Sequence, residues 1–531
     1  MSGERNSLIG DTPQTWRDKL FTPKFVLGMW TLMNFWTYFD RGAISASLSN
    51  VKASPDIAGA EGVLSDAQAG AIGSAFMVGF FLTCPIFAAL GGTFTAKQII
   101  TAGLIVWALA CVSTGLSQDY WMIVISRCFV GVGEAAYAGY TVTIIDNMAP
   151  PASRTMWIGL FYSMIPVGTA IGMTAGGIVS SKVTLPGGYA GWRIVFLAEI
   201  IPMIPIIIGN AMLPVKYNPV KETEVAAAAE TADPEEAETG AQGRPKDDFI
   251  TLPKAIKMLA TNLSYICLVF GYAMYTFVLG AISIWAISML EQGPLHLDAV
   301  ASSLFMGGTV CITGLAGSIC GGLFVDKLGG SQGDKGVLQC CKYNVLMVTL
   351  SLPLGFIAMS SSNVWVFGSL FIVGVFLLFS VTAPITAAML SVVPSPLRTY
   401  SVSFSVFFMH MLGDFPSPLI AGEISDKFSG GCDSLTLAGN TTCMGHNDCR
   451  WIPKKGVEDA SCVNIYQLRN ALLCVWAFIF LAIPAWGSVG IRMYRKVKGK
   501  EEEFQAHIDA GHTSIQNVSQ CSLRTSETVP Y

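Results

Sequence analysis

Twelve apolar segments of about twenty residues recur along this 531-residue chain, and each is long enough to cross the hydrocarbon core of a bilayer. Charged residues make up only 13% of the sequence, against about 25% in soluble proteins, and the mean hydropathy is +0.53. We therefore predict an all-α polytopic membrane protein that binds no nucleic acid. The segments begin near Phe25, Ala67, Gln98, Trp121, Thr155, Trp192, Asn262, Asp298, Lys342, Val364, Thr399 and Tyr466.

The segments fall into two groups of six, which predicts two six-helix bundles at residues 25–213 and 261–493. Between them, residues 214–260 are rich in Ala, Glu and Pro and almost lack large apolar side chains. Such a segment cannot bury a core, so we predict a largely disordered cytosolic linker. The polar residues 1–24 and 494–531 are predicted to be cytosolic tails.

Lysine and arginine are concentrated on one side of the predicted spans. They gather in both tails, in the linker and in the loop with Lys335 and Lys342, whereas the opposite loops carry few. The positive-inside rule therefore places both termini in the cytosol. The stretch from Glu4 to Ile9 resembles an acidic dileucine sorting signal, so we expect an endolysosomal membrane or the plasma membrane.

A cysteine-rich loop, residues 428–465, lies on the predicted non-cytosolic side. It contains the glycosylation acceptor Asn440 within Asn-Thr-Thr. Four cysteines in an oxidising compartment predict two disulfides, in one of three pairings. A zinc site is the alternative, although the spacing contains no Cys-x-x-Cys knuckle. The four cysteines are Cys432, Cys443, Cys449 and Cys462.

Two pairs of charged residues interrupt the predicted spans, where ionised groups are costly and therefore indicate function. Asp40 and Arg41 lie in the first span, and Arg127 and Glu134 lie seven residues apart in the fourth. At about 1.5 Å per residue, Asp40, Arg41 and Arg127 share one depth, and Glu134 lies about 10 Å deeper. We expect Arg127 and Glu134 to share a helix face that lines a watery cavity.

This cluster suits an anionic head group. A guanidinium stays charged and binds phosphate or carboxylate through paired hydrogen bonds, whereas Asp40 and Glu134 can exchange protons as their surroundings change from dry to wet. Substrate binding and protonation would then compete. The alternative is a fixed ion pair that only holds helices together, with Asp40 permanently neutralising Arg127 or Arg41.

His410 is predicted near mid-depth in the eleventh span, with Asp414 one turn further on the same face. An imidazole that titrates near neutrality can relay protons, and the alternative role is a hydrogen bond to a neighbouring helix. Glu423 and Asp426 fall near the outer end, where we expect hydration and no special chemistry.

These residues give the chain its resemblance to the Spinster transporters of the major facilitator superfamily. The similarity covers nearly the whole predicted membrane core and is most specific in the fourth and eleventh spans. The motifs that carry it are Asp40-Arg41, Arg127 to Tyr137, Phe161 to Gly168, His410 to Pro418 and Ser425-Asp426.

The resemblance implies two pseudo-symmetric bundles around a central cavity that opens alternately to either side, with the first and fourth helices facing it. It also implies a secondary transporter of a lysophospholipid or a sphingolipid-type amphiphile, coupled to protons. By this resemblance, Asp40 and Glu134 are the expected proton carriers, and Arg41 and Arg127 are the expected head-group or gating residues.

Aromatic side chains in the first, fourth and fifth spans are expected either to line a path for the acyl chain or to pack; they are Tyr38, Tyr137 and Tyr162 with Trp36 and Phe39. In the fifth span, Pro166 can kink the helix. Glycines recur there at every fourth position and allow a second backbone to approach closely. We interpret them as packing between the rocking halves, with static packing as the alternative; they are Gly168, Gly172 and Gly176.

One stretch departs from the superfamily pattern. The loop after the second span usually carries a charged latch, but residues 88–97 have lost its aspartate and both arginines. The second half keeps Asp326 next to Lys327, a reduced counterpart. We expect this loss to weaken the charge network that favours closure on the cytosolic side.

The sequence carries no signature of an enzyme, and without a Walker loop we expect no ATP-driven step. We expect neither a cofactor nor a metal. Transport would be facilitated or coupled to an ion. Two alternatives stay open, namely a carrier of small organic anions and a membrane receptor or scaffold that kept the fold without turnover.

Overall fold

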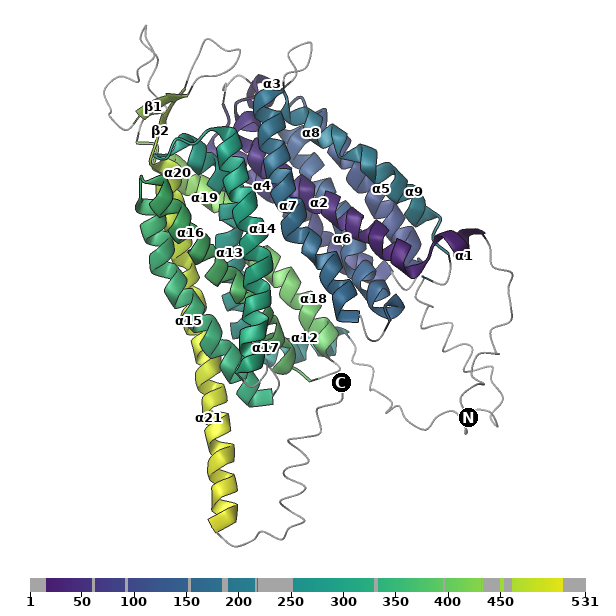
Figure 1. Cartoon of the computed structure of the whole chain (residues 1–531), viewed down its shortest axis with the longest axis vertical. Coiled ribbons are helices and arrows are strands. Elements are labelled where there is room, and N and C mark those ends of the chain that lie inside the picture. The colour runs from purple at the N-terminus through teal and green to yellow at the C-terminus, as the bar shows by residue number, and fades with distance from the viewer. Residues whose placement is uncertain are drawn as a thin grey trace.

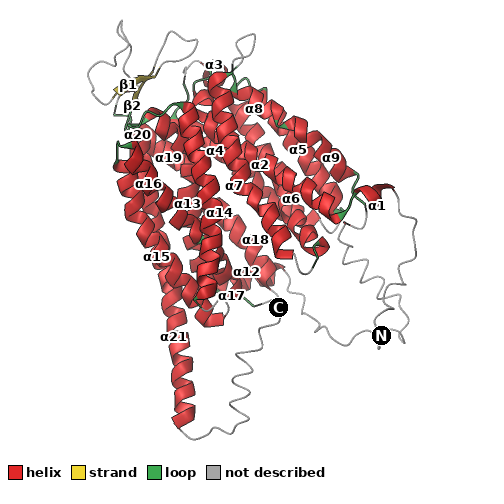
Figure 2. Cartoon of the chain, viewed as in Figure 1, coloured by secondary structure: helices red, strands yellow, loops and turns green. Residues whose placement is uncertain are grey.

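The computed structural model describes residues 16–59, 63–90, 94–150, 154–183, 190–214, 217, 252–328, 333–394, 397–430, 432, 449–452 and 461–509. Figure 2 shows helices through nearly all of this part, with one short pair of strands. Figure 1 shows two helical bundles side by side, one built from the amino-terminal half of the chain and one from the carboxy-terminal half.

The amino-terminal bundle contains five long helices and one broken helix. Short helices α1 (Trp16–Leu20) and α3 (Pro55–Ala58) flank the first long helix. The membrane-length elements are α2 (Pro23–Lys52), α4 (Asp66–Leu90), α5 (Ala96–Gly115), α6 (Tyr120–Met148), α7 (Arg154–Lys182) and the broken pair α8 (Trp192–Ala198) and α9 (Ile200–Ala211).

The carboxy-terminal bundle repeats this plan after the short helix α12 (Leu252–Thr261). A hairpin of β1 (Cys449–Ile452) and β2 (Ser461–Asn464) precedes its last helix. Its elements are α13 (Leu263–Gln292), α14 (Ala299–Lys327), α15 (Gly333–Ser360), α16 (Val364–Ser380) with α17 (Thr382–Ser391), α18 (Arg398–Met409) with α19 (Pro416–Lys427), and α20 (Gln467–Ala477) with α21 (Ala482–Asp509).

Ten helical segments of the described chain are long and apolar enough to cross a membrane. The two other predicted spans are also helical, as α2 and as the continuous run from α18 to α19. The structure is therefore consistent with the predicted six plus six. Most predicted first residues lie within two positions of the observed ones, but α15 begins at Gly333 rather than near Lys342. Its first turns are polar, and hydropathy marks only the apolar part of a helix.

Side-chain caps explain why several helices begin where they do. The Thr22 hydroxyl accepts a hydrogen bond from the Phe25 amide at 3.3 Å, and the Asp119 carboxylate accepts one from the Met122 amide at 2.8 Å. Each cap satisfies one of the amides that the first helical turn leaves without a partner. The polar residues at these span ends therefore define where α2 and α6 begin.

Two predicted boundaries differ from the structure. Residues 252–260, the last part of the predicted linker, form α12 together with Thr261, and Ala255 and Leu259 are buried against the carboxy-terminal bundle. The predicted tail boundary at 493–494 lies inside α21, which continues to Asp509. The Lys500 ammonium ties this extension to the Asp334 carboxylate of α15 at 2.7 Å. The rest of the linker and the tails, with Glu4 to Ile9, lie outside the described residues.

The cysteine-rich loop contains one disulfide in the described chain, between Cys432 and Cys449. This bond removes two of the four thiols that a zinc site would need. Cys462 lies on β2 opposite Trp451, and its side chain is not described. Cys443 and the acceptor Asn440 lie outside the described residues, so the second disulfide and the glycan stay predictions.

The two bundles meet toward one end of the molecule. We call the end with β1, β2 and α3 the hairpin end, and the opposite end, with α12, the α12 end (Figure 1). The core of the carboxy-terminal bundle takes in Ala46, Ala69 and Met173, which all lie on the hairpin-end halves of their helices. Toward the α12 end the helices of the two bundles diverge (Figure 1).

Candidate functional site

Helix α2 places two charged residues in different environments. Successive side chains on a helix lie about 100° apart, so Asp40 and Arg41 cannot face the same neighbour. Asp40 is 0% exposed and points into the amino-terminal bundle, whereas the Arg41 side chain is 17% exposed. The two residues therefore belong to two separate ion pairs.

The first pair joins Asp40 to Arg127 of α6. Both terminal nitrogens of the guanidinium donate to the carboxylate, at 2.6 and 2.7 Å, and neither side chain has any exposed surface. The prediction that Asp40 and Arg127 share a depth is confirmed. The expectation that Arg127 lines a watery cavity is wrong in this conformation, because the guanidinium lies inside the bundle beside Phe196 of α8.

The second pair joins Arg41 of α2 to Glu134 of α6. The Arg41 Nε donates to a Glu134 oxygen at 3.2 Å, and a terminal nitrogen donates to the other oxygen. Although Glu134 lies about two turns below Arg127 on α6, the long arginine side chain spans the difference in depth. The guanidinium lies between the rings of Tyr38 and Phe76, 4.6 Å from each centroid.

Close packing of α4 on α6 brings Phe76 to this position. A Cβ at Gly131 would overlap the Phe76 carbonyl, and a Cβ at Gly79 would overlap the Cys128 carbonyl. Only glycine allows two helix backbones to approach this closely. One turn after Phe76, the Phe80 ring packs edge-on against the His410 imidazole of the other bundle, with centroids 5.3 Å apart.

His410 and Asp414 form the polar group on the carboxy-terminal side. The His410 Nδ1 lies 2.8 Å from a carboxylate oxygen of Asp414, which confirms that they share a face. They bound one widened, π-helical turn in which the Phe415 amide bonds back to the His410 carbonyl. Pro416 follows directly and has no amide hydrogen to continue an ordinary α-helical ladder.

We call Tyr38, Arg41, Glu134, His410 and Asp414 the central site. His410 packs on Phe80, one turn from the Phe76 ring that covers Arg41, so both bundles contribute polar groups to this region. The site combines a guanidinium, two carboxylates and an imidazole with aromatic rings. This set of groups can bind an anion and can hold or pass a proton.

The predicted aromatic lining divides into packed and accessible rings. Tyr137 is 2% exposed, and Phe39 is also buried within the amino-terminal bundle. Tyr162 is 46% exposed, and Tyr38 stacks on Arg41 as described above. Packing therefore accounts for Phe39 and Tyr137, whereas Tyr38 and Tyr162 remain available to a ligand.

The predicted gating residues of α7 fall into two groups, those that pack within one bundle and one that faces the other bundle. Added Cβ atoms at Gly168 and Gly172 would meet the carbonyls of Phe35 and Phe39 on α2. These glycines therefore pack two helices of one bundle, and the interpretation of packing between the halves is wrong for them. Pro166 does face the other bundle, with its Cβ 3.2 Å from the Cβ that Gly314 lacks. Asp326 lies on the last turn of α14, and its side chain is not described.

A polar network at the hairpin end was not anticipated. Asp426 of α19 accepts hydrogen bonds at 2.9 Å from the amides of Asp66 and Ala67, and so caps α4 of the opposite bundle. The buried Asp66 carboxylate binds Lys52 and accepts from Ser425 at 2.6 Å and from Gln467 at 2.9 Å. We call this network the hairpin-end latch. The expectation that Asp426 needs only hydration is wrong, because this carboxylate joins the bundles.

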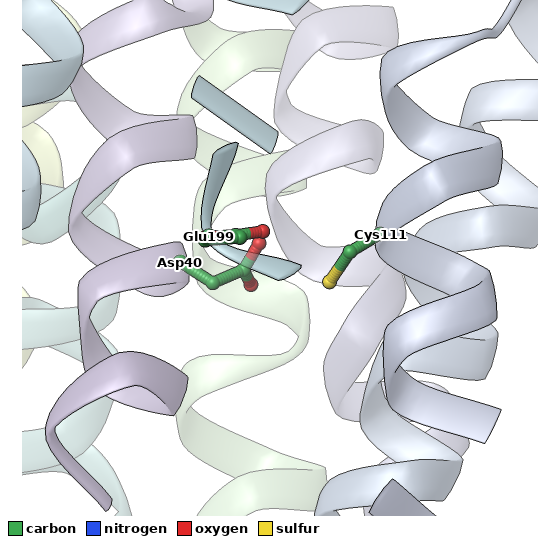
Figure 3. Close-up of side chains that lie close together, drawn as sticks. All are labelled: Asp40, Cys111 and Glu199. Atoms are coloured by element: carbon green, nitrogen blue, oxygen red, sulfur yellow. The ribbon is translucent and has the colours of Figure 1, made fainter. Parts of the chain in front are cut away.

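Glu199 is a second residue that sequence reasoning missed. It lies at the junction of α8 and α9, is 1% exposed, and approaches Asp40 and Cys111 (Figure 3). A single acidic residue within an apolar span is the same signal that identified Arg127 and Glu134. That signal was present in the sequence between Ala198 and Ile200.

Comparison with known proteins shows which families this chain resembles. The sequence model of the Major Facilitator Superfamily matches residues 30–418. A probable sphingolipid transporter of Arabidopsis thaliana, spinster homolog 1, is 30% identical over 446 residues, which are 80% of this chain and 87% of the relative. The sphingosine-1-phosphate transporter SPNS2 of Danio rerio is 28% identical over 419 residues, which are 76% of this chain and 77% of the relative.

The fold likeness agrees with these matches. A solved bacterial homolog of the human lysosomal transporter Spinster, inward-facing and unoccupied, has a TM-score of 0.70 at 17% identity, covering 89% of this chain and 98% of that one. The two helical bundles, together with the family match over residues 30–418, identify an integral, multi-pass membrane transporter of the major facilitator fold, not an enzyme. Within that superfamily, the chain belongs to the spinster family.

Proposed function

We propose that the chain is an alternating-access secondary transporter of a lysophospholipid or a sphingolipid-type amphiphile, coupled to protons. The observation that carries the proposal is the Arg41 guanidinium, held between two aromatic rings where the bundles face each other. A phosphate head group is bound by a guanidinium through paired hydrogen bonds, and an acyl chain needs apolar surface nearby. The names of the relatives from Arabidopsis thaliana and Danio rerio support this class of cargo.

The pairing of Arg41 with Glu134 supports the proposed proton coupling. An ionised Glu134 and an anionic head group are both acceptors, and they compete for the same guanidinium donors. A proton on Glu134 removes its charge and frees Arg41 for the head group. Proton and substrate would therefore bind together, which reverses the competition that the sequence suggested. His410, whose ring packs on Phe80 of the amino-terminal bundle, is the proposed relay for this proton.

Alternating access requires one end of the bundles to be closed while the other is open. The hairpin-end latch supports a state closed at the hairpin end, and the diverging helices support access from the α12 end (Figure 1). In this state the cargo reaches the central site from the α12 end. Opening the other side breaks the latch.

The test is transport into liposomes that contain the purified chain. We expect uptake of labelled sphingosine-1-phosphate or lysophospholipid to accelerate under a pH gradient and to be lost in Arg41→Ala. Glu134→Gln should keep exchange without a gradient and lose the response to pH, because a neutral amide imitates the protonated acid. Glu423→Gln, exposed on α19, is the matched control and should transport normally.

Three results would contradict the proposal. A pH response in Glu134→Gln equal to that of the unaltered chain removes Glu134 from coupling. Equal inhibition by a lysolipid and by its isolated head group favours a carrier of small organic anions, because only an amphiphile carrier needs the chain. Lipid binding without movement under any gradient favours a receptor or scaffold.

We further propose that the α12 end is cytosolic, in an endolysosomal membrane or the plasma membrane. The disulfide between Cys432 and Cys449 supports this orientation, because such bonds persist in oxidising compartments. A glycan at Asn440 would lie on the same side. Glycosidase treatment should lower the apparent mass of the chain, and Asn440→Gln should abolish the shift; a glycan attached at the α12 end would overturn the orientation.

A further inference from the structure

We propose that Glu199 is a proton-binding site of this transporter, separate from the central site, which holds one proton against Asp40 inside the amino-terminal bundle. Its carboxylate oxygens, those of Asp40 and the Cys111 sulfur include three atoms that all lie within 4.8 Å of one another. Figure 3 shows the Glu199 and Asp40 carboxyl groups adjacent, with the Cys111 sulfur directed toward them.

The charges around this site do not balance without a proton. Arg127 supplies the single positive charge, and both of its terminal nitrogens are bound to Asp40. Glu199 is 1% exposed, and among the described residues no N–H or O–H group donates to either of its oxygens, so only the weakly donating Cys111 thiol faces it. Two ionised carboxylates beside one guanidinium would leave a net negative charge sealed from water.

The neighbouring helices offer no second cation. At this level α5 contributes Cys111 and α6 contributes Arg127, while α7 carries charge only at its two ends and α9 carries none. Arg193 of α8 is engaged elsewhere, with the carbonyls of Gly115 and Ser117 and with Asp56. On α2, Arg41 is bound to Glu134. Within the described part of these helices, every nearby cation therefore already has an anionic or carbonyl partner.

An isolated carboxylate in such surroundings takes up a proton, because burying the charge costs far more than neutralising it. Two carboxyl groups in contact commonly share one proton. Both Asp40 oxygens already accept from Arg127, so the proton resides on Glu199. Its hydroxyl then donates to Asp40 or to the Cys111 sulfur, which gives the orphaned oxygen a partner.

A metal ion fits this donor set poorly. Both oxygens of Asp40 are turned to the guanidinium, which would repel a cation placed between the same side chains. Metal ligation would also require the thiolate of Cys111 in a site that already has two acidic groups. A proton neutralises the site without displacing Arg127.

The inference rests on the proposed function only in one respect, that this proton is exchanged during transport. When water enters the bundle, the O–H bond of Glu199 breaks and the proton passes to water. The carboxylate that remains is then solvated. The Asp40–Glu199 pair thus adds a second proton to that of Glu134.

Infrared spectroscopy of the purified chain tests the protonation directly. We expect a carboxylic-acid C=O band that shifts in D2O, disappears in Glu199→Gln and remains in Glu134→Gln and Glu423→Gln. Cys111→Ala should keep the band and shift its frequency, because it alters the hydrogen bond. The Cys111 variant keeps the test decisive if Glu199→Gln does not fold. A band unaltered by both substitutions shows that Glu199 is ionised and overturns the inference.

Liposome measurements separate this inference from the proposed function. Glu199→Gln should retain exchange of lipid and move fewer protons per lipid than the unaltered chain. An equal proton-to-lipid ratio in the two proteins would show that the Glu199 proton is not exchanged during transport. If the unaltered chain moves no lipid, the proposed function fails, and the infrared band still decides whether Glu199 holds a proton.

Discussion

At the scale of single residues, Asp40 and Arg41 show how one step along a helix separates two roles. The Asp40–Arg127 pair is sealed within a bundle, where removing either partner leaves an unpaired charge. The Arg41–Glu134 pair lies where the bundles face each other, and its guanidinium retains some exposure. The first pair has the geometry of the fixed ion pair considered from the sequence. The second has the geometry of a pair that can exchange partners.

Replacing Arg127 should therefore affect stability more than replacing an exposed charge. In Arg127→Met, the buried Asp40 carboxylate loses its cation, and we expect a loss of about 3–5 kcal/mol. The loss should be smaller at acidic than at alkaline pH, because protonation removes the buried charge in the folded state. Thermal unfolding in detergent across a pH series measures both effects.

The matched control is the double variant Arg127→Met with Asp40→Asn. It removes the charge of both partners, so much of the lost stability should return. If the double variant is no more stable than Arg127→Met alone, the cost comes from lost packing around Arg127 and not from an unpaired charge.

At the scale of helices, glycines fix how closely α2 and α7 approach. Along α7, Gly168, Gly172 and Gly176 all face the α2 backbone. This close contact makes the two helices move as one unit, so rocking must occur at other surfaces. The contact of Pro166 with Gly314 and of Gly177 with Ser303 identifies such a surface between α7 and α14.

Two glycines of α7 give a matched comparison. A Cβ at Gly172 would overlap the Phe39 carbonyl, whereas a Cβ at Gly159 meets nothing within 4 Å. Gly172→Ala should lower stability by about 1–3 kcal/mol through overpacking. Gly159→Ala should leave it unchanged or raise it by up to about 1 kcal/mol, because alanine favours the helix. Equal thermal midpoints for the two variants would contradict this close approach.

At the scale of the whole molecule, hydropathy predicted the spans and their grouping because apolar length is a local property of the sequence. The start of α15 and the extension of α21 were missed, since helices that leave the membrane become polar while remaining helical. Asp40 and Arg127 could be predicted to share one depth because the rise per residue is fixed. The pairing of Arg41 with Glu134 could not be predicted, because it depends on side-chain length and on how the helices rotate against each other.

Contacts between the two bundles are the feature of the structure that is hardest to predict from one sequence. Asp66 and Asp426 are 360 positions apart, and no local pattern links them. Glu199 could have been predicted as a functional residue, because it is an acidic residue in an apolar span. Its neighbours Asp40 and Cys111 could not, because they come from two other helices. The family resemblance supplied the adjacency of α2 and α6 that depth alone could not.

The hairpin-end latch should set the balance between the two access states. Asp426→Ala removes two hydrogen bonds to the first amides of α4, a cap that contributes about 0.5–2 kcal/mol. Because these bonds exist only while the bundles touch at the hairpin end, their loss should shift the population toward the state open on that side, by about 5–30-fold for 1–2 kcal/mol. Hydrogen exchange should accelerate at Asp66 and Ala67 and in α19.

Glu423→Ala, exposed on the same helix, is the control and should leave exchange unchanged. Local fraying of α4 would also expose the two amides, but it would leave the α12 end as it is. Opening of the hairpin end must instead close the α12 end, so α12-side segments of α7 and α18 should become more protected in Asp426→Ala. Faster exchange at Asp66 and Ala67 without that added protection would show that Asp426 is only a helix cap.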